Sequence, residues 1–191
     1  MHVARDLHVE EIRSGSGGIT AASTAETAII DYFARGPMNQ AVRVTSYREF
    51  ESSFGGLHPW SEGSYAVRQY FLNGGEAAWL VRVPAGDPRT ATVLLTGGSL
   101  TVMAANPGGW GNNLQVCVTA GDSEFILSVR ENGVAGGEVF AGLTMNPASP
   151  QYAIRVVNES SQLIRLSDEG SGEFPSAEDG WQSLQDGSGA G

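Results

Sequence analysis

Residues 105–118 read Ala-Asn-Pro-Gly-Gly-Trp-Gly-Asn-Asn-Leu-Gln-Val-Cys-Val. Pro107 fixes its φ angle and lacks an N–H, and the glycines permit positive φ or close backbone approach, so the first half predicts a turn. Residues 114–118 alternate as a half-buried strand does. We expect Trp110 to cover a core and to donate its indole N–H to a backbone acceptor. The predicted structural turn comprises Asn106, Pro107, Gly108, Gly109, Trp110, Gly111 and Asn112.

The part of the chain before this turn predicts a small α/β layer, which we place at residues 20–88. Ser46 has the position of a helix N-cap, and Glu49 completes a capping box. Residues 77–83 form a nearly continuous apolar run, which is typical of a strand buried on both faces, so we expect Trp79 to be core. The predicted elements are strands 27–33 and 41–44, helices 47–54 and 63–73, and strand 77–83.

Residues 89–166 predict a β-rich domain with a sandwich- or barrel-like fold, which makes the whole chain α+β. Short strands recur between turn signals, and Asn132-Gly133 is a strong hairpin signal. Residues 167–191 combine acidic side chains with many Gly and Ser residues and contain no basic side chain, which predicts a linker. The predicted elements are strands 92–95, 100–103, 114–118, 125–129 and 138–140, helix 151–158 and strand 162–166.

Residues 1–19 predict an extended N-terminal arm that ends in a flexible Gly/Ser hinge. Apolar and polar residues alternate in the arm as they do in a short strand. Because a strand at the chain end has few local partners, it can pair with its own sheet or with a neighbour's open sheet edge. The predicted arm strand comprises Leu7, His8, Val9, Glu10, Glu11 and Ile12, and the hinge glycines are Gly15, Gly17 and Gly18.

The composition argues against several classes of function. The 191 residues carry a net charge of −10, and all 11 basic residues are Arg. An acidic chain without an Arg cluster repels phosphate backbones, so we expect no nucleic-acid partner. The absence of Lys removes the P-loop lysine and Schiff-base chemistry. Because the sequence shows no secretory signal and no long apolar run, we expect cytosolic synthesis and no direct membrane insertion.

The sequence predicts no catalytic, metal or cofactor site. His8, His58 and Cys117 lie far apart without metal-ligand spacing. A serine hydrolase would need a nucleophile elbow such as Gly-x-Ser-x-Gly, and the Gly-Ser-Gly runs lack that frame. Cys117 alternates with valines in a predicted strand, which favours a structural thiol over a nucleophile. We therefore expect that the protein is not an enzyme and binds no metal or cofactor.

Seven stretches of this sequence, taken in order, resemble the N-terminal half of contractile tail sheath proteins. Those proteins form the sleeve of myophage tails, R-type pyocins and extracellular contractile injection systems. Two of the matching stretches are Phe-Ala-Arg-Gly-Pro at residues 33–37 and Leu-Val-Arg-Val at residues 80–83. The others are residues 8–15, 44–56, 65–75, 105–114 and 139–147.

The resemblance implies a structural subunit that polymerises as stacked, six-fold rings around an inner tube. The implied partners are other sheath subunits, the inner tube protein, and baseplate and cap proteins. Terminal arms add strands to neighbouring subunits, and contraction of the rings drives the tube through a target envelope. The resemblance also implies assembly in the cytoplasm and a place in a phage tail or a phage tail-like particle.

Two features depart from the family pattern. The arm begins Arg5-Asp6-Leu7-His8, where family members often have a Pro-Gly-Val-Tyr-like sequence. The family also continues into a large C-terminal α/β domain that completes the core, so we expect the layer at residues 20–88 to leave an open sheet edge. The chain is then either a fragment or a short sheath-like protein whose other half another chain supplies.

A second hypothesis belongs to another class of function. A sheath-like accessory protein, or a surface-displayed β-domain, could bind glycans or other ligands through exposed aromatic and amide side chains. The candidate platform residues are Trp60, Trp110, Asn112, Asn113 and Asn132.

Overall fold

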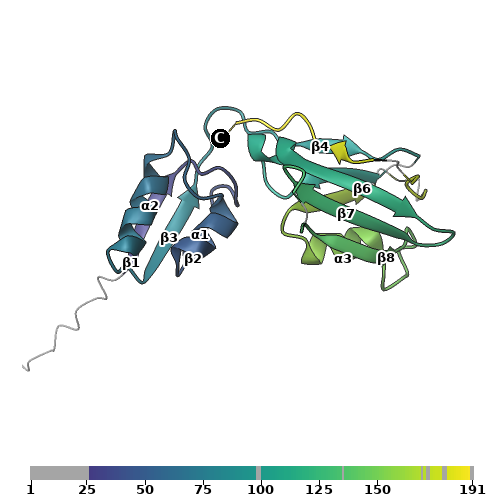
Figure 1. Cartoon of the computed structure of the whole chain (residues 1–191), viewed down its shortest axis with the longest axis horizontal. Coiled ribbons are helices and arrows are strands. Elements are labelled where there is room, and N and C mark those ends of the chain that lie inside the picture. The colour runs from purple at the N-terminus through teal and green to yellow at the C-terminus, as the bar shows by residue number, and fades with distance from the viewer. Residues whose placement is uncertain are drawn as a thin grey trace, which may run out of the picture.

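The computed structural model describes residues 26–97, 100–134, 136–168, 170, 173–177 and 180–189. The predicted arm strand at residues 7–12 and the hinge glycines lie outside these residues. The described chain forms an α+β fold, as expected, with three helices and three separate sheets. Figure 1 shows an α/β unit (described residues 26–83) and a β-rich unit (described residues from 89 to 189).

The α/β unit follows the predicted order of two strands, two helices and a strand. Strands β1 (Glu26–Asp31), β2 (Ala41–Val44) and β3 (Ala77–Arg82) form one sheet in the order β1-β3-β2. Strand β1 runs parallel to β3, and β2 runs antiparallel to it. Helices α1 (Tyr47–Phe54) and α2 (Glu62–Leu72) cover one face of this sheet.

Helix α1 begins and ends where the sequence predicts. The Ser46 hydroxyl accepts a hydrogen bond from the Glu49 N–H at 3.2 Å, and Gly55 ends the helix with a φ of 88°. The Glu49 carboxylate accepts hydrogen bonds from the backbone N–H and the hydroxyl of Thr45, at 2.8 and 2.9 Å. The reciprocal bond of this capping box thus reaches one residue before the N-cap.

The core of the α/β unit lies between the helices and one face of the sheet. Aromatic rings dominate it, and Phe33 packs edge-on against Phe50 and Phe54 at centroid distances of 5.5 and 5.2 Å. The fully buried side chains are Phe33, Val44, Phe50, Phe54, Val67, Ala78 and Leu80.

The expectation that Trp79 is core was wrong. Its side chain is 40% exposed, while its neighbours Ala78 and Leu80 are buried. Successive side chains of a strand point to opposite faces, and the described helices cover only the face of Ala78 and Leu80. An apolar run therefore did not distinguish a strand covered on both faces from one covered on a single face.

The β-rich unit consists of two sheets that share a core. Strands β5 (Leu100–Ala104), β4 (Thr92–Leu94) and β9 (Ile164–Asp168) form one sheet in the order β4-β5-β9. The other has the order β10-β6-β7-β8, and helix α3 (Ala153–Ser160) packs against β9 and β8. The strands of this second sheet are β6 (Leu114–Ala120), β7 (Phe125–Glu131), β8 (Val139–Leu143) and β10 (Gln182–Ser183).

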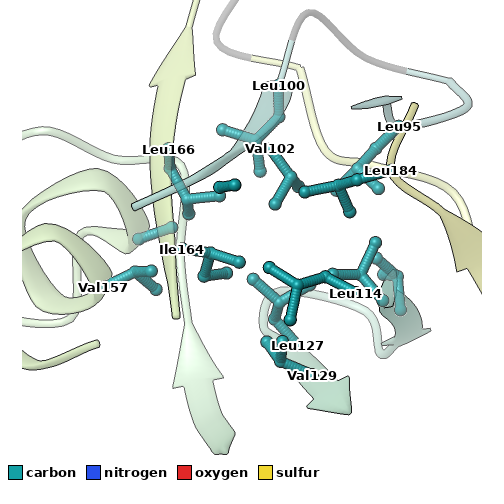
Figure 2. Packing of buried hydrophobic residues seen from close by; sticks show 14 of the residues in the cluster. Leu95, Leu100, Val102, Leu114, Leu127, Val129, Val157, Ile164, Leu166 and Leu184 are labelled. Carbon is teal, nitrogen blue, oxygen red and sulfur yellow. The ribbon is translucent and has the colours of Figure 1, made fainter. Parts of the chain in front are cut away.

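Apolar side chains from the two sheets and α3 form the larger core of the molecule. Figure 2 shows these side chains converging from β5, β6, β7, β9 and α3. The arrangement is sandwich-like, and the sheets of the described residues do not close into a barrel. The labelled residues are Leu95, Leu100, Val102, Leu114, Leu127, Val129, Val157, Ile164, Leu166 and Leu184.

The predicted turn at Asn132-Gly133 is confirmed. Both residues have positive φ, 53° and 72°, and the Val134 N–H donates to the Glu131 carbonyl at 3.0 Å. Strands β7 and β8 pair through Ser128 and Val139, so the connection between them is longer than the two-residue loop of the tightest hairpins.

The structure corrects the prediction that residues 167–191 form a linker. Strand β10 pairs with β6, and Leu184 is 1% exposed within the larger core. Gln185 exchanges two backbone hydrogen bonds with Thr92, and Ser188 does so with Arg89. The large apolar residues of this segment, Phe174, Trp181 and Leu184, are scattered among polar residues and glycines, so they form no periodic pattern that outweighs its acidic Gly/Ser-rich composition.

Candidate functional site

The predicted structural turn forms a 3₁₀-helix, η1 (Gly109–Asn113), which enters β6 directly. Trp110 is 8% exposed and belongs to the larger core. Gly111 is needed because a Cβ there would lie 2.8 Å from the Cβ atoms of Ala91 and Ala104. The Trp110 indole N–H is buried and finds no acceptor among the described residues, where the sequence led us to expect a backbone carbonyl.

The same turn holds the returning C-terminal segment. The Asn112 side-chain oxygen accepts from the Gly187 N–H at 2.8 Å, and its amide nitrogen donates to the Gly187 carbonyl at 2.9 Å. A Cβ at Gly187 would lie 2.5 Å from the Gly108 carbonyl oxygen, so only glycine allows this approach. Residues 87–92 and 185–189 therefore lie side by side, and the chain enters and leaves the β-rich unit at one place (Figure 1).

One face of the α/β sheet has no cover among the described residues, and we call it the open face. Strand register places Ala28, Ile30, Trp79, Val81 and Ala41 on it, with Glu26 and Arg43. Ile30 is 67% exposed, and β1 and β2 are the edges of the sheet. An exposed apolar face with unpaired edges is typical of a surface that another polypeptide covers.

Polar side chains cross the open face in a fixed pattern. Arg43 on β2 donates to Glu26 on β1 at 2.8 Å, and the Trp79 indole N–H donates to the other oxygen of Glu26 at 3.0 Å. The bonds from Arg43 and then from Trp79 hold the pKa of Glu26 below its ordinary value. The indole of Trp79 is thus oriented across the open face rather than left free to rotate.

On the covered side of the sheet, a buried arginine holds the turn that follows β1. Arg82 is fully buried and donates to the carbonyls of Phe33 at 2.8 Å, Gly36 at 2.8 Å and Ala34 at 3.3 Å. Burial lowers the pKa of Arg82 to about 10, so the side chain stays charged at neutral pH. Its charge is stabilised by backbone dipoles.

This turn presents Arg35 to the β-rich unit. The Arg35 Nη1 lies 3.1 Å from Glu131 Oε2, and its guanidinium carbon lies 6.0 Å from the centre of the Trp110 ring. Around this contact is a cleft of about 400 Å³, lined by residues of both units, which we call the inter-unit cleft. Sequence reasoning missed it, although an Arg within the apolar run 80–83 signals a buried cation that needs acceptors.

The structure does not bring the remaining candidate residues together. His58 lies in the α/β unit beside Tyr32, Cys117 lies on β6, and His8 is outside the described residues. Among the described residues, no three His, Cys, Asp or Glu side chains are grouped so as to hold a metal ion. None of the helices described here is both long and apolar enough to cross a membrane.

The proposed glycan platform is not assembled as one surface. Trp60 is 75% exposed in the α/β unit, whereas Trp110 is buried in the β-rich unit and Asn112 is bonded to Gly187. Asn113 and Asn132 lie close together, because the Asn132 N–H donates to the Asn113 carbonyl at 2.8 Å. The two tryptophans therefore do not form one exposed platform.

The comparison with solved structures shows which known fold this chain resembles. No protein-family model matches the chain, and no curated protein matches it significantly. The sheath tail protein from Listeria innocua matches with a TM-score of 0.65 and 16% identity over 87% of this chain and 34% of that one. The sheath tail protein from Desulfitobacterium hafniense matches with a TM-score of 0.59 and 15% identity over 98% of this chain and 39% of that one.

These likenesses show that the chain has a sheath-like fold. They support the part of the resemblance inferred from the sequence that concerns the fold. The chain spans between a third and two fifths of the length of the two solved structures. At such low identity the likeness concerns the fold alone.

Proposed function

We propose that this chain is a structural part of a contractile tail sheath, and that its role is assembly rather than catalysis. Its subunits would form stacked rings around an inner tube and contract to drive that tube through a target envelope. The observation that carries the proposal is the likeness in fold to two sheath tail proteins, over 87% and 98% of this chain.

The open face supports an assembly role independently of that likeness. The three-stranded sheet exposes Ile30 and Trp79 on one side and has two edge strands. Covering such an apolar surface lowers the free energy of the protein in water. We propose that further polypeptide, either a second part of the same protein or another chain, covers it.

We further propose that residues 7–12 donate a strand to a neighbouring subunit. The proposal rests on their alternating pattern and on the glycines at positions 15, 17 and 18. Such a link holds while subunits move, because the glycine-rich segment allows the strand to keep its partner. The proposed partners are other sheath subunits, the inner tube, and baseplate and cap proteins, with assembly in the cytoplasm.

Sedimentation of the purified protein over a concentration series, with negative-stain electron microscopy of the pellet, tests this role. We expect pelletable rings or tubes from the wild-type chain. Deletion of residues 1–18 should abolish the linkage between subunits while the circular dichroism spectrum is retained. Trp60→Ala, which changes an exposed side chain, serves as the matched control. Unchanged assembly after the deletion would reject strand donation, and saturable glycan retention by a monomer would favour the binding hypothesis.

A further inference from the structure

We propose that the contact between the two units is a salt-sensitive latch. Arg35 and Glu131 hold the α/β unit against the β-rich unit in a closed arrangement, and residues 84–86 allow the units to separate into an open one. The inference concerns the movement of the two units relative to each other and does not depend on the proposed sheath function. It rests on the separate cores, the connecting segment and the charges at the contact.

The two units have separate cores. Buried apolar side chains of the α/β unit gather around Phe33 and Phe50, and those of the β-rich unit gather around Leu114 and Leu127. No buried apolar residue of the described chain belongs to both clusters. Units of one chain move relative to each other unless a large apolar interface joins them. The inter-unit cleft of about 400 Å³ also leaves space between the facing surfaces, so the cores do not fix the arrangement.

A short exposed segment, residues 84–86, connects the two units (Figure 1). Before it, the Val83 N–H donates to the Asp31 carbonyl at 3.0 Å within the α/β unit. After it, the Ser188 hydroxyl of the β-rich unit donates to the Asp87 carbonyl at 3.2 Å. The glycine of this segment has a φ of 82°, and a Cβ there would meet no described atom within 4 Å. The segment can therefore change its dihedral angles while both units keep their own hydrogen bonds.

Arg35 supplies the attraction across the contact. Its Nη1 lies 3.1 Å from Glu131 Oε2, and its guanidinium carbon lies 6.0 Å from the centre of the Trp110 ring. The side chains of the ion pair are 21% and 36% exposed, so dissolved ions reach them. Both interactions are electrostatic, and salt screens such interactions between partly exposed groups. The attraction that closes the contact should thus weaken as the salt concentration rises.

A buried donor of the same side chain opposes closure. The Nε–H of Arg35 is buried and has no acceptor among the described residues. A donor in this position has lost its bond to water and gained none in return, which costs free energy. When the units separate, the guanidinium returns to water and the donor regains an acceptor. The closed arrangement is therefore only modestly favoured, and a small change in the attraction shifts the balance.

Double electron–electron resonance between spin labels on the two units tests the latch. The labels are attached to Gln69→Cys on α2 and Ser123→Cys between β6 and β7, which are exposed positions, with Cys117→Ser to remove the native thiol. At low salt we expect one narrow distance distribution. At about 1 M sodium chloride, where the Debye length is about 3 Å, we expect a second distance population from the open arrangement.

Variants of the ion pair identify the cause of this shift. Glu131→Gln and Arg35→Gln each remove the pair, and each should raise the open population at low salt about threefold to tenfold. Arg43→Gln is the matched control, because it removes an ion pair with Glu26 inside the α/β unit. This control should leave the distance distribution unchanged.

Exchange of the two charges gives a second test. Arg35→Glu alone should populate the open distance at low salt, and Arg35→Glu combined with Glu131→Arg should restore the narrow distribution. The salt series uses the unmodified contact, so it decides the question even if a variant fails to fold. Three results would overturn the proposal: a distribution that does not change with salt, equal effects of Glu131→Gln and Arg43→Gln, or a charge-exchanged protein that behaves like Arg35→Glu.

Discussion

The Nη1 of Arg82 lies 2.8 Å from the carbonyl oxygen of Gly36. Through this bond and its bonds to Phe33 and Ala34, a buried guanidinium on the central strand β3 fixes the turn that follows β1. That turn carries Arg35, which pairs with Glu131 in the β-rich unit. A side chain in the core of one unit thus determines how that unit contacts the other.

Arg82→Met tests this arrangement. Methionine fills much of the same space but leaves three backbone carbonyls without their donor, and each unsatisfied buried group costs about 1–3 kcal/mol. We expect urea denaturation, followed by circular dichroism, to show a loss of about 3 kcal/mol or more. Arg43→Met on the open face is the control and should change stability little, because exposed ion pairs contribute little. Equal effects of the two changes would contradict the role assigned to Arg82.

Trp110→Ala should destabilise the β-rich unit. The indole is almost fully buried in the larger core, and truncation of a buried aromatic side chain costs about 3–5 kcal/mol. Trp60→Ala, at an exposed position, should change stability by about 0.5 kcal/mol or less. Thermal unfolding checks both variants, and an unchanged midpoint for Trp110→Ala would show that the ring is not core.

Leu184→Ala tests whether the C-terminal segment is part of the fold. Leu184 is buried beside β6, so its truncation should cost about 2–5 kcal/mol. Leu94→Ala makes the same chemical change at a site that is 61% exposed and should cost about 0.5 kcal/mol or less. Guanidinium denaturation of both variants gives the comparison, and a neutral Leu184→Ala would restore the linker interpretation.

The cap of α1 predicts a dependence of stability on pH. Hydrogen bonds from the backbone N–H and then the hydroxyl of Thr45 lower the pKa of Glu49 from its ordinary value of 4.5. A lowered folded-state pKa stabilises the fold at pH values above 4.5, and this contribution is lost as the pH falls through the folded-state value. Glu49→Gln should therefore be less stable than wild type at pH 6, and the difference in free energy of unfolding should become smaller on acidification. If urea titrations give the same difference at pH 6 and at acidic pH, this linkage is excluded.

Local signals in the sequence predicted much of the fold. Ser46, Glu49 and the glycines at 55–56 define α1 because capping depends on neighbouring residues only. The strands that the sequence predicts are present in the predicted order, because their alternation or apolar runs are also local, whereas β10 was missed.

Features that depend on distant contacts could not be predicted in the same way. The exposure of Trp79 depends on what covers the second face of the sheet, and β10 exists only because β6 offers it an edge. The inter-unit cleft joins Arg35 and Glu131, which are 96 positions apart. No pattern within a short window encodes such a pairing, so the candidate site became visible only in three dimensions.

The most direct test of the proposed sheath role is negative-stain electron microscopy of the particle from its native source, combined with mass spectrometry of its most abundant protein band. The account predicts a striated, contractile tube whose sheath band contains this sequence. A soluble monomer without any tube, or this sequence only in a band of low copy number, would contradict it.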